Sequence, residues 1–299
     1  MSETARRMRW STETRLEFIE FRLFWEGSLN RSDIIDFFGV SVPQASNDLA
    51  RYQEIAPKNL YYDRRAKRFL ATDAFEPAFR KPDADRYLNQ LRSIGERVLE
   101  AHETWVAAIP CFDVMPVPHR QVDPMILRSV LRAIRAKRAV HINYQSLTRP
   151  DAIWRWITPH ALCSDGLRWH VRAFCHIERI FKDFLLPRFF EVKEEADPGA
   201  PASADVPWTE WVDVVLAPHP QLTPGQRRVV ALDFGIEGES LKVSVRLALL
   251  YYFLKRLNLE GDPERRAPKE QHLVVANKMD VRTALKRAEE QIPLGGQQN

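Results

Sequence analysis

The sequence predicts a multidomain α+β protein that begins with a winged helix-turn-helix. Its 299 residues are about twice the size of one typical domain, so two or three domains are expected. Three helical patterns and a basic hairpin come first, and short alternating strand patterns fill the centre. Polar stretches that contain proline separate these regions and mark the expected domain boundaries.

Composition excludes two classes of protein and leaves the partner open. Hydrophobic residues make up 45% and charged residues 28%, which is a globular balance, and no uncharged run is long enough to cross a bilayer. The formal net charge of +4 allows a polyanionic partner without requiring one. A disordered chain and a membrane protein are therefore excluded.

Cysteine usage and the N-terminal residues both favour a reducing compartment. The three cysteines, Cys111, Cys163 and Cys175, lack CxxC spacing, so neither a disulfide scaffold nor a cysteine-only zinc site is expected. Residues 1–10 contain no apolar stretch of the kind found in secretory signals. We therefore expect a cytoplasmic protein.

Three helices are expected before residue 56. Apolar side chains at spacings of three and four predict a helix at 12–24, and a second, short helix at 33–38 ends at Gly39. A tight turn follows, and the third helix begins at Ser41 or Val42 with a proline in its first turn. This spacing predicts a helix-turn-helix.

The third helix and the segment after it carry the side chains expected to contact DNA. Short or planar hydrogen-bonding side chains of the third helix are suited to base edges in a major groove. Two short strands, 60–62 and 68–71, flank a basic turn that is suited to phosphates. The predicted DNA-binding residues are Ser41, Gln44, Ser46, Asn47, Arg51, Arg64, Arg65, Lys67 and Arg68. The alternative is a small helical domain whose basic turn is only a solvated loop.

A connecting segment is expected between residues 83 and 120. A boundary near residue 82 precedes a helix predicted at 85–103, with Val98 and Leu99 on its apolar side. Prolines at 110, 116 and 118 then predict an extended linker. The winged domain is therefore placed at 1–82.

A mostly β domain is expected at 121–196. Asp123 followed by proline predicts the start of a helix that ends near Arg138. Strands are predicted at 140–145, 153–157, 167–175 and 181–192, and these would form a small barrel or sandwich.

The strand around residue 170 has two different faces. Alternation puts Trp169, Val171, Ala173 and Cys175 on an apolar face. The opposite face carries Arg168, His170, Arg172 and Phe174. Two arginines and a histidine spaced two residues apart are suited to gripping an anion, so this face is a candidate ligand cradle.

This strand and its neighbours resemble the WYL domain. The resemblance rests on residues 166–175, with 142–146 and 157–162 before them and 181–188 after them, and the Trp-Tyr-Leu signature appears here as Trp169-His170-Val171. The variant with histidine is similar to WYL regulators that accompany BREX and CBASS phage-defence operons. The resemblance covers the whole chain: a winged helix-turn-helix, a WYL domain and a C-terminal extension used for dimerisation.

The resemblance implies an Sm-like β-barrel that senses a nucleotide-like or nucleic-acid effector and thereby changes the affinity of a dimer for its operator. Trp169 would lie in the core. The ligand residues implied by position are Tyr144, Ser146, His160, Arg168, His170, Arg172 and Arg188.

Two metal sites are considered and disfavoured. A zinc site from His160, Cys163, His170 and Cys175 fails because His170 and Cys175 should lie on opposite faces of one strand. A nuclease site is suggested by the acidic pair and lysine of Asp151, Glu191 and Lys193, but solvation explains these residues. No Gly-rich phosphate loop or GxSxG elbow occurs, so no cofactor, metal or enzymatic activity is expected.

A third, α+β domain is expected at 205–299, after a linker at 197–203. Its predicted elements are strands at 208–216 and 229–234, a helix at 241–257, a strand at 272–276 and a helix at 281–292. The apolar helix at 241–257 would pack in the core or at a subunit interface, and its lysines and arginines forbid a membrane span.

Together these features predict a homodimeric, sequence-specific DNA-binding transcriptional regulator, most simply a repressor of a phage-defence operon. Two copies would bind an inverted-repeat operator with half-sites about 34 Å apart. The alternative is a nucleic-acid-sensing adaptor that binds single strands and has no operator specificity. A metal-dependent nuclease is a weaker alternative.

Overall fold

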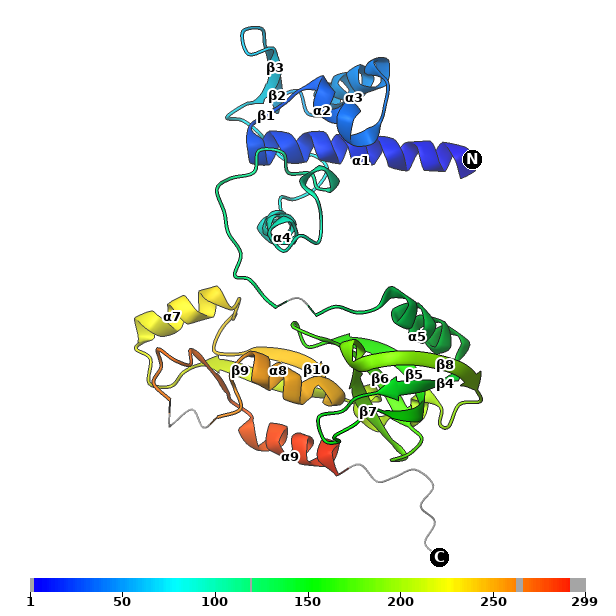
Figure 1. Cartoon of the computed structure of the whole chain (residues 1–299). Helices are drawn as coiled ribbons and strands as arrows, with labels where there is room; N and C mark the ends of the chain where they lie inside the picture. The colour runs from blue at the N-terminus through cyan, green and yellow to red at the C-terminus, as the bar shows by residue number, and fades with distance from the viewer. Residues whose placement is uncertain (1–2, 119, 262–265, 291–299) are drawn as a thin grey trace, which may run out of the picture. The chain divides into compact units, whose positions relative to one another are not determined.

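The computed structural model describes residues 3–118, 120–261 and 266–290, and for residues 3–11 it describes the backbone only. The chain divides into two compact units, Met1–Pro118 and His119–Asn299 (Figure 1). Each unit has its own hydrophobic core. The units are described separately.

The first unit is a winged helix-turn-helix followed by a connecting helix. Its elements up to the hairpin are α1 (Glu3–Glu26), β1 (Ser28–Leu29), α2 (Arg31–Phe38), α3 (Val42–Ile55), β2 (Leu60–Asp63) and β3 (Arg68–Ala71). The predicted three helices and hairpin are confirmed. The two-residue strand β1 was not predicted; it pairs with β3 and gives the order β1-β3-β2.

Local signals explain where these helices start and stop. Gly39 adopts a left-handed φ of 64° and donates its N–H to the carbonyl of Ile35, which ends α2. Ser41 then caps α3. The three helices bury side chains such as Phe18, Ile34 and Tyr52 in one core.

The connecting helix is shorter than predicted. Helix α4 spans Ala84–Gly95, and a 3-10 turn, η1, follows at Ala101–Glu103. The chain leaves the helix because Arg97 takes a left-handed φ of 57°, and the N–H groups of Val98 and Leu99 turn back to the carbonyl of Ser93. Val98 is 67% exposed, so its predicted place on a buried helix face is wrong.

The second unit begins with a helix and a five-stranded antiparallel sheet. The elements are α5 (Pro124–Ala136), β4 (Ala139–Tyr144), β5 (Ile153–Ser164), β6 (Trp169–Cys175), β7 (Ile180–Leu185), η2 (Leu186–Arg188) and β8 (Phe189–Ala196). Helix α5 packs Val130 and Ala133 against one face of the sheet, where they meet Ile142 and Val171.

The strand order is β7-β6-β5-β4-β8, which leaves β7 and β8 as the two edges. Within the described residues the sheet is therefore open, and a closed Sm-like barrel is not observed. The strand predicted at 181–192 is in fact two strands, because η2, with Pro187 in it, interrupts the pairing.

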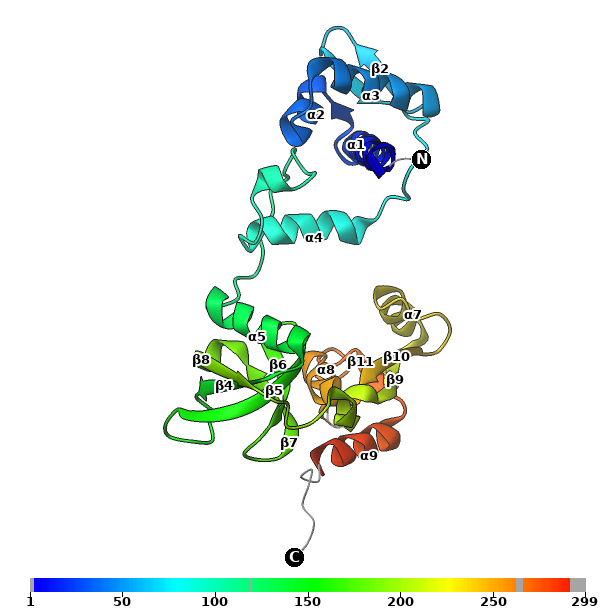
Figure 2. The same cartoon turned by 90° about the vertical axis from the view of Figure 1, so that its right-hand side faces the viewer.

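The rest of the second unit is an α+β layer with three strands in the order β10-β9-β11 (Figure 2). Its elements are η3 (Ala202–Ala204), α6 (Val206–Thr209), β9 (Trp211–Pro218), α7 (Pro224–Asp233), β10 (Leu241–Arg246), η4 (Leu247–Leu249), α8 (Leu250–Arg256), β11 (Leu273–Val275) and α9 (Lys278–Glu289).

One predicted element of this layer is wrong, and two are confirmed only in part. The strand predicted at 208–216 is confirmed from Trp211 onward as β9, but its start lies in helix α6. The strand predicted at 229–234 is wrong, because Thr223 and Pro224 start helix α7 just upstream and the helix runs through 233. The helix predicted at 241–257 starts as strand β10, where apolar and polar residues alternate.

Ile292, in the last predicted helix, lies outside the described residues. None of the helices described here could cross a membrane.

Candidate nucleic-acid interface and effector site

Helix α3 presents one exposed face and one buried face. The Ser41 hydroxyl accepts a hydrogen bond from the N–H of Gln44 at 3.4 Å and so fixes the first turn. Leu49 and Tyr52 pack into the core, while Asn47 and Arg51 lie on the exposed side. This is the arrangement that a recognition helix needs.

A buried ion pair orients α3 on α1. Arg15 donates from Nε to Asp48 Oδ2 at 2.5 Å and from Nη2 to Asp48 Oδ1 at 3.1 Å. Gln44 also donates to Asp48 Oδ1, at 3.0 Å, and the Ser46 hydroxyl donates to the carbonyl of Val42 at 2.8 Å. Gln44 and Ser46 are therefore already engaged within their own helix.

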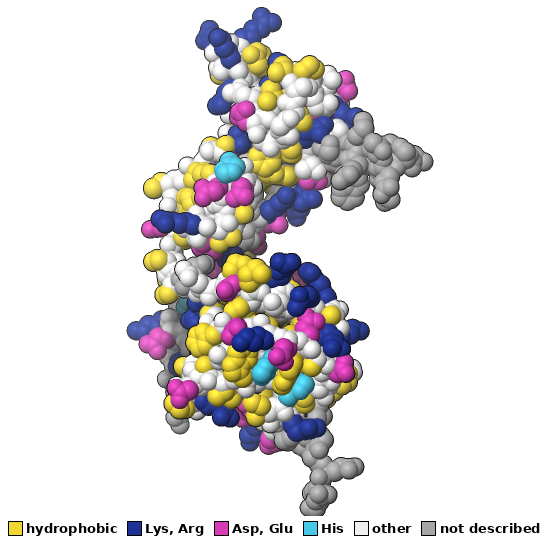
Figure 3. All heavy atoms as spheres, turned by 45° about the vertical axis from the view of Figure 1, so that its right-hand side comes forward, with side chains coloured by type: hydrophobic (Ala, Val, Ile, Leu, Met, Phe, Trp, Pro, Cys, Tyr) yellow, Lys and Arg dark blue, Asp and Glu magenta, His cyan; other side chains and the backbone are white. Residues whose placement is uncertain are grey.

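The hairpin between β2 and β3 is a basic wing. Asp63 Oδ1 accepts from the N–H groups of Arg65 (2.7 Å) and Ala66 (3.1 Å), and Lys67 takes a left-handed φ of 54°. This tight turn exposes Arg64, Arg65 and Lys67, whereas Arg68 is half-buried at the start of β3. Basic side chains cluster at this end of the unit in Figure 3.

Recognition helix and wing lie on the same side of α1. Both views of the fold place α3 and the hairpin on one side of α1 and α4 on the other (Figures 1 and 2). Across the described parts of the chain, no ion pair neutralises Arg51, Arg64, Arg65 or Lys67. These four side chains are available to an anionic partner.

Glu20 of α1 holds the chain that follows the wing. Its buried carboxylate accepts from the N–H groups of Ala78 (2.6 Å), Phe79 (3.0 Å) and Arg80 (3.0 Å), and from the Tyr52 hydroxyl at 3.2 Å. Burial, and then the nearby Glu20 carboxylate, raises the pKa of Tyr52, although Asn59 opposes the shift. Glu20 thus ties the segment after the wing to α1 and α3.

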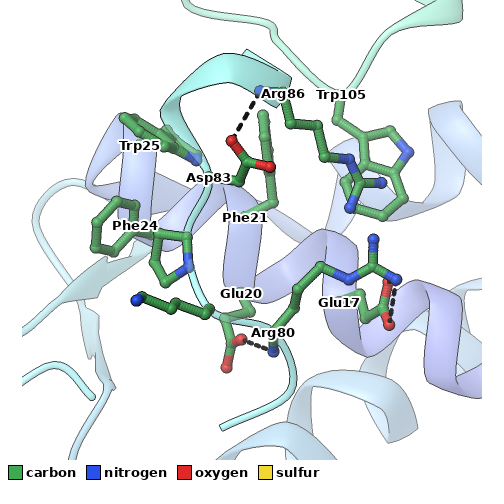
Figure 4. A pocket seen from close by; sticks show the side chains of 11 residues that line it. Glu17, Glu20, Phe21, Phe24, Trp25, Arg80, Asp83, Arg86 and Trp105 are labelled. Atoms are coloured by element: carbon green, nitrogen blue, oxygen red, sulfur yellow. Dashed lines mark hydrogen bonds and ion pairs between the residues drawn. The ribbon is translucent and has the colours of Figure 1, made fainter. Parts of the chain in front are cut away.

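A small pocket next to Glu20 is too small for an effector. It lies between α1, the segment at 80–83, Arg86 and Trp105, and Arg80 reaches across it to Glu17 (Figure 4). Its volume of about 40 Å³ has room for a few water molecules. The candidate effector site is therefore the one predicted in the second unit.

The ligand residues predicted from the WYL resemblance do not form one group. Tyr144 lies in the core of the five-stranded sheet, where its hydroxyl accepts from the N–H of Leu185 at 3.2 Å. Ser146 exchanges a hydrogen bond with the Thr148 hydroxyl, and the Arg188 carbonyl accepts from the N–H of Gln145. The other four predicted ligand residues contact three carboxylates, those of Asp165, Asp183 and Asp205.

Arg172 is bound by two carboxylates from elsewhere in the chain. It donates to Asp205 from Nε at 2.7 Å and from Nη2 at 2.9 Å, and to Asp183 from Nη1 at 3.2 Å. His160 Nε2 lies 2.8 Å from Asp205 Oδ2. Asp205 is fully buried, so this side of β6 is closed by the protein's own carboxylate.

The charge of Asp205 is stabilised by these contacts. Burial alone raises its pKa, but hydrogen bonds from Arg172 and then His160 outweigh burial and leave the pKa below its ordinary value. Asp205 also caps α6 by accepting from the N–H of Trp208 at 3.3 Å. One carboxylate therefore joins strand β6 to the first helix of the C-terminal layer.

A third carboxylate, Asp165, binds the other two predicted ligand residues. Arg168 Nε lies 2.7 Å from Asp165 Oδ2, and His170 Nε2 lies 3.1 Å from the same oxygen. Burial raises the Asp165 pKa, but the N–H of Leu167, then Arg168 and His170, hold it far below its usual range. The His170 ring also packs against Tyr252, 4.8 Å away, and Tyr252 donates to Asp183 at 3.0 Å.

Sequence reasoning missed the partners and misplaced one aromatic residue. Asp165, Asp183, Asp205 and Tyr252 complete the cluster. Asp205 had a local signal, since an aspartate two residues before proline often caps a helix, and Asp165 had one in its turn with Gly166. Trp169 is 55% exposed, so its predicted place in the core is wrong. It lies at the first position of β6, and the core begins two residues later at Val171.

The residues of the two disfavoured metal sites do not form a metal cluster. Throughout the described ranges, no three histidine, cysteine or acidic side chains are grouped so as to hold a metal ion. Glu191 lies on β8 in an exposed ion pair with Lys193 at 3.0 Å. Burial, with Asp183 nearby, raises the pKa of the Cys163 thiol to about 12, so this cysteine is a neutral thiol.

Three family models match separate parts of the chain. Residues 11–93 match the BrxR transcriptional regulator winged helix-turn-helix domain, and residues 125–194 match the WYL domain. Residues 211–281 match the BrxR transcriptional regulator C-terminal dimerization domain. The three matches correspond to the winged unit, the five-stranded sheet and the C-terminal layer.

Curated relatives match along nearly the whole length. Proteins named DNA-binding transcriptional repressor CapW are 40% identical in Stenotrophomonas maltophilia (94% of this chain and of that protein), 40% in Pseudomonas aeruginosa (92% of each) and 37% in Escherichia coli strain KTE188 (93% of each). A solved structure, proteasome accessory factor B/C (PafBC) of Arthrobacter aurescens, has 15% identity and a TM-score of 0.25, which supports no conclusion. The match covers 93% of this chain and 49% of that one, so this chain spans about half the length of that structure.

Proposed function

Because the chain belongs to the family of DNA-binding transcriptional repressors that includes the CapW proteins, we propose that it binds an inverted-repeat operator as a homodimer and represses a phage-defence operon. The family is regulatory and not enzymatic. The observation that carries the proposal is the pairing of an exposed face of α3 with an unneutralised basic wing on one side of α1.

In this proposal Asn47 and Arg51 read base edges. Both are exposed, and both have the planar hydrogen-bonding groups that distinguish base pairs in the major groove. Ser41, Gln44 and Ser46 hold the helix start in place through the bonds described above, and Gln44 keeps its amide oxygen free to accept from a base. Loss of Asn47 should therefore relax specificity more than it weakens overall binding.

The wing residues are assigned to the phosphate backbone. Arg64, Arg65, Lys67 and Arg68 carry positive charge at the hairpin, and contacts to phosphate release counterions. Each lost phosphate contact should weaken binding to all sequences alike. It should also reduce the slope of log affinity against log salt by about 0.9.

The effector part of the proposal concerns the cluster around Arg172. The forked contact of Arg172 with a carboxylate has the same geometry as its contact with a phosphate. A nucleotide or nucleic-acid phosphate would therefore compete with Asp205 for Arg172 and with Asp165 for Arg168. Such a ligand shifts DNA binding only if it binds the two states of the dimer unequally.

The remaining structural details are part of the same proposal. The order β7-β6-β5-β4-β8 puts the last strand beside the first, and this supports an Sm-like fold for the WYL domain. The proposed domain limits are 1–82 for the winged domain, 83–120 for the connector, 121–196 for the WYL domain and 205–299 for the dimerisation domain. A repressor of this kind acts where the operator is, in the cytoplasm.

The experiment is a footprint and a salt-dependent binding assay on DNA upstream of the protein's own gene. We expect protection of an inverted repeat, relaxed specificity for Asn47→Ala and a reduced salt slope for Arg65→Ala. Arg92→Ala, an exposed arginine on α4, is the matched control and should bind as the unaltered protein does. Equal affinity for every duplex overturns the proposal, and tighter binding to single strands would favour the adaptor instead.

A further inference from the structure

Helix α7 is largely exposed on the surface of the C-terminal layer. Leu232 is 82% exposed and Val229 is 59% exposed, and Phe234, just after the helix, is exposed as well. Only Val230 of the helix is buried, with Ala231 packed partly beside it. In both views α7 lies at an outer edge of this unit (Figures 1 and 2).

This exposed helix is well formed and is not a frayed segment. The Thr223 hydroxyl accepts from the N–H of Gln226 at 3.4 Å, and Gln226 Oε1 accepts from the N–H of Thr223 at 3.0 Å, which makes a capping box. A rigid helix that directs apolar side chains away from its own core is typical of a protein contact. The match of 211–281 to a dimerization domain includes α7.

The exposed face of α7 is complementary to itself. Val229 lies three residues before Leu232 and four before Asp233, and Arg228 lies four before Leu232, so these side chains lie on one side of the helix. An antiparallel pair about a twofold axis between positions 230 and 231 would place Val229 opposite Leu232 of the partner subunit. The same register places Arg228 opposite Asp233 of the partner subunit, and twofold symmetry repeats both contacts.

The charges on this face have no competing partner in the described part of the chain. Arg228 and Asp233 are exposed, and none of the ion pairs or hydrogen bonds among the residues that the structure describes involves either side chain. Neighbouring Arg227, by contrast, donates to the carbonyl of Pro220 at 2.8 Å. Two unpaired opposite charges therefore flank two exposed apolar side chains.

We propose that α7 packs antiparallel against α7 of a second copy and forms the centre of the homodimer interface. The inference rests on the proposed homodimer and specifies its contact. Val229 and Leu232 form the apolar centre, and Arg228 and Asp233 form two symmetric ion pairs that set the register. A pair of ten-residue helices covers less than the about 800 Å² per partner typical of stable complexes, so the contact continues onto adjacent surface.

The first test compares two leucines of equal exposure in the full chain by sedimentation equilibrium over a range of protein concentrations. Leu232→Asp should weaken dimerisation by about 100-fold or more, because each substitution acts twice across a twofold axis. Leu147→Asp, at a position that is 83% exposed in the turn after β4, is the control and should leave the dimer unchanged. Circular dichroism checks that both variants are folded.

The second test uses charge exchange, which does not depend on burying a charge in an apolar contact. Arg228→Asp alone and Asp233→Arg alone each oppose like charges twice and should weaken the dimer. The double variant Arg228→Asp with Asp233→Arg should restore dimerisation to within a few-fold of the unaltered protein, and the single variants should be sensitive to salt.

The outcomes separate the contact from the dimer itself. Rescue by the double variant supports the antiparallel register. A stable dimer that none of the α7 substitutions weakens overturns the α7 contact and leaves α7 to another partner or another part of the chain, while the homodimer stands. An unaltered protein that stays monomeric at tens of micromolar overturns the homodimer in the proposed function as well.

Discussion

Replacement of Asp205 by asparagine tests the buried cluster directly, because the two side chains have the same shape and differ in charge. In the structure Asp205 accepts two hydrogen bonds from Arg172, one from the N–H of Trp208, and contacts Nε2 of His160. Asparagine would keep one acceptor oxygen, but its amide N–H₂ group would face one of the donors that Asp205 now accepts from, and two donors cannot bond to each other. The charge of the buried Arg172 would then be balanced by Asp183 alone.

The expected loss of stability follows from the burial of both groups. Removal of one partner from a buried ion pair typically costs about 3–5 kcal/mol, because the remaining charge is left without compensation. Domain unfolding free energies are only about 5–15 kcal/mol, so this loss is large. With a urea dependence of about 2 kcal/mol per M, the unfolding midpoint of the second unit should fall by about 1.5–2.5 M.

The assay is urea unfolding of the full chain followed by circular dichroism. Hydrogen exchange of peptides from β6 and α6 identifies the unit that has lost stability. Asp213→Asn is the control: Asp213 is exposed on β9 with Ser244 and Lys242 as partners, and its replacement should leave the midpoint unchanged. The double variant Arg172→Met with Asp205→Leu should be more stable than Asp205→Asn, since it removes both charges of the Arg172–Asp205 pair, and Asp183 keeps the Tyr252 hydroxyl as a donor.

A midpoint shift below about 0.5 M for Asp205→Asn would refute this reasoning, because it would mean that Arg172 is solvated and not held by Asp205. A double variant that is less stable than Asp205→Asn would refute it in a different way. That result would show that the cluster contributes through packing and not through charge.

Three other predictions address single features of the fold. The folded-state pKa values of Asp165 and Asp205 are lowered, so the two carboxylates stabilise the fold above pH about 4, and this contribution is lost as pH falls through the lowered values. The unfolding free energy of Asp205→Asn should therefore change less with pH in the acid range than that of the unaltered protein. Gly39→Ala should lower the unfolding free energy of the first unit by about 1 kcal/mol because of the left-handed φ, and Gly39→Asn should lower it less; equal losses would contradict this explanation. Iodoacetamide should modify the exposed Cys111 in the native protein and leave the buried Cys163 and Cys175 unmodified, as peptide mass spectrometry can show; early modification of Cys163 would contradict its burial and its raised pKa.

The first unit could be predicted well because its signals are local. Gly39, Ser41 and the proline after Val42 mark helix ends within a few residues of where they act, and the basic turn is bounded by short strands. The C-terminal layer was predicted less well because its apolar runs are short. Residues 229–234 resemble a strand, yet the helix start at Thr223 decides their structure.

The candidate effector site could be predicted only in part, because its residues are brought together by contacts between distant segments. His160, Arg168, His170 and Arg172 were identified from alternation and resemblance. Asp165 lies only three residues before Arg168, but Asp183 and Asp205 reach Arg172 through tertiary packing. Asp205 lies 33 positions after Arg172, and Tyr252 lies 69 positions after Asp183. No local pattern encodes pairings of that separation.

In the proposed function, the position of the cluster would couple the WYL domain to the dimerisation domain. Arg172 and His170 belong to the stretch that matches the WYL domain, whereas Asp205 lies outside that stretch and Tyr252 lies within the dimerization match. Their contacts therefore join two domains, and Asp205 also starts the helix that leads into β9. In the proposed function, a phosphate that displaced Asp205 from Arg172 would weaken these contacts, and its binding would shift the equilibrium between two arrangements of the C-terminal layer if it bound them unequally.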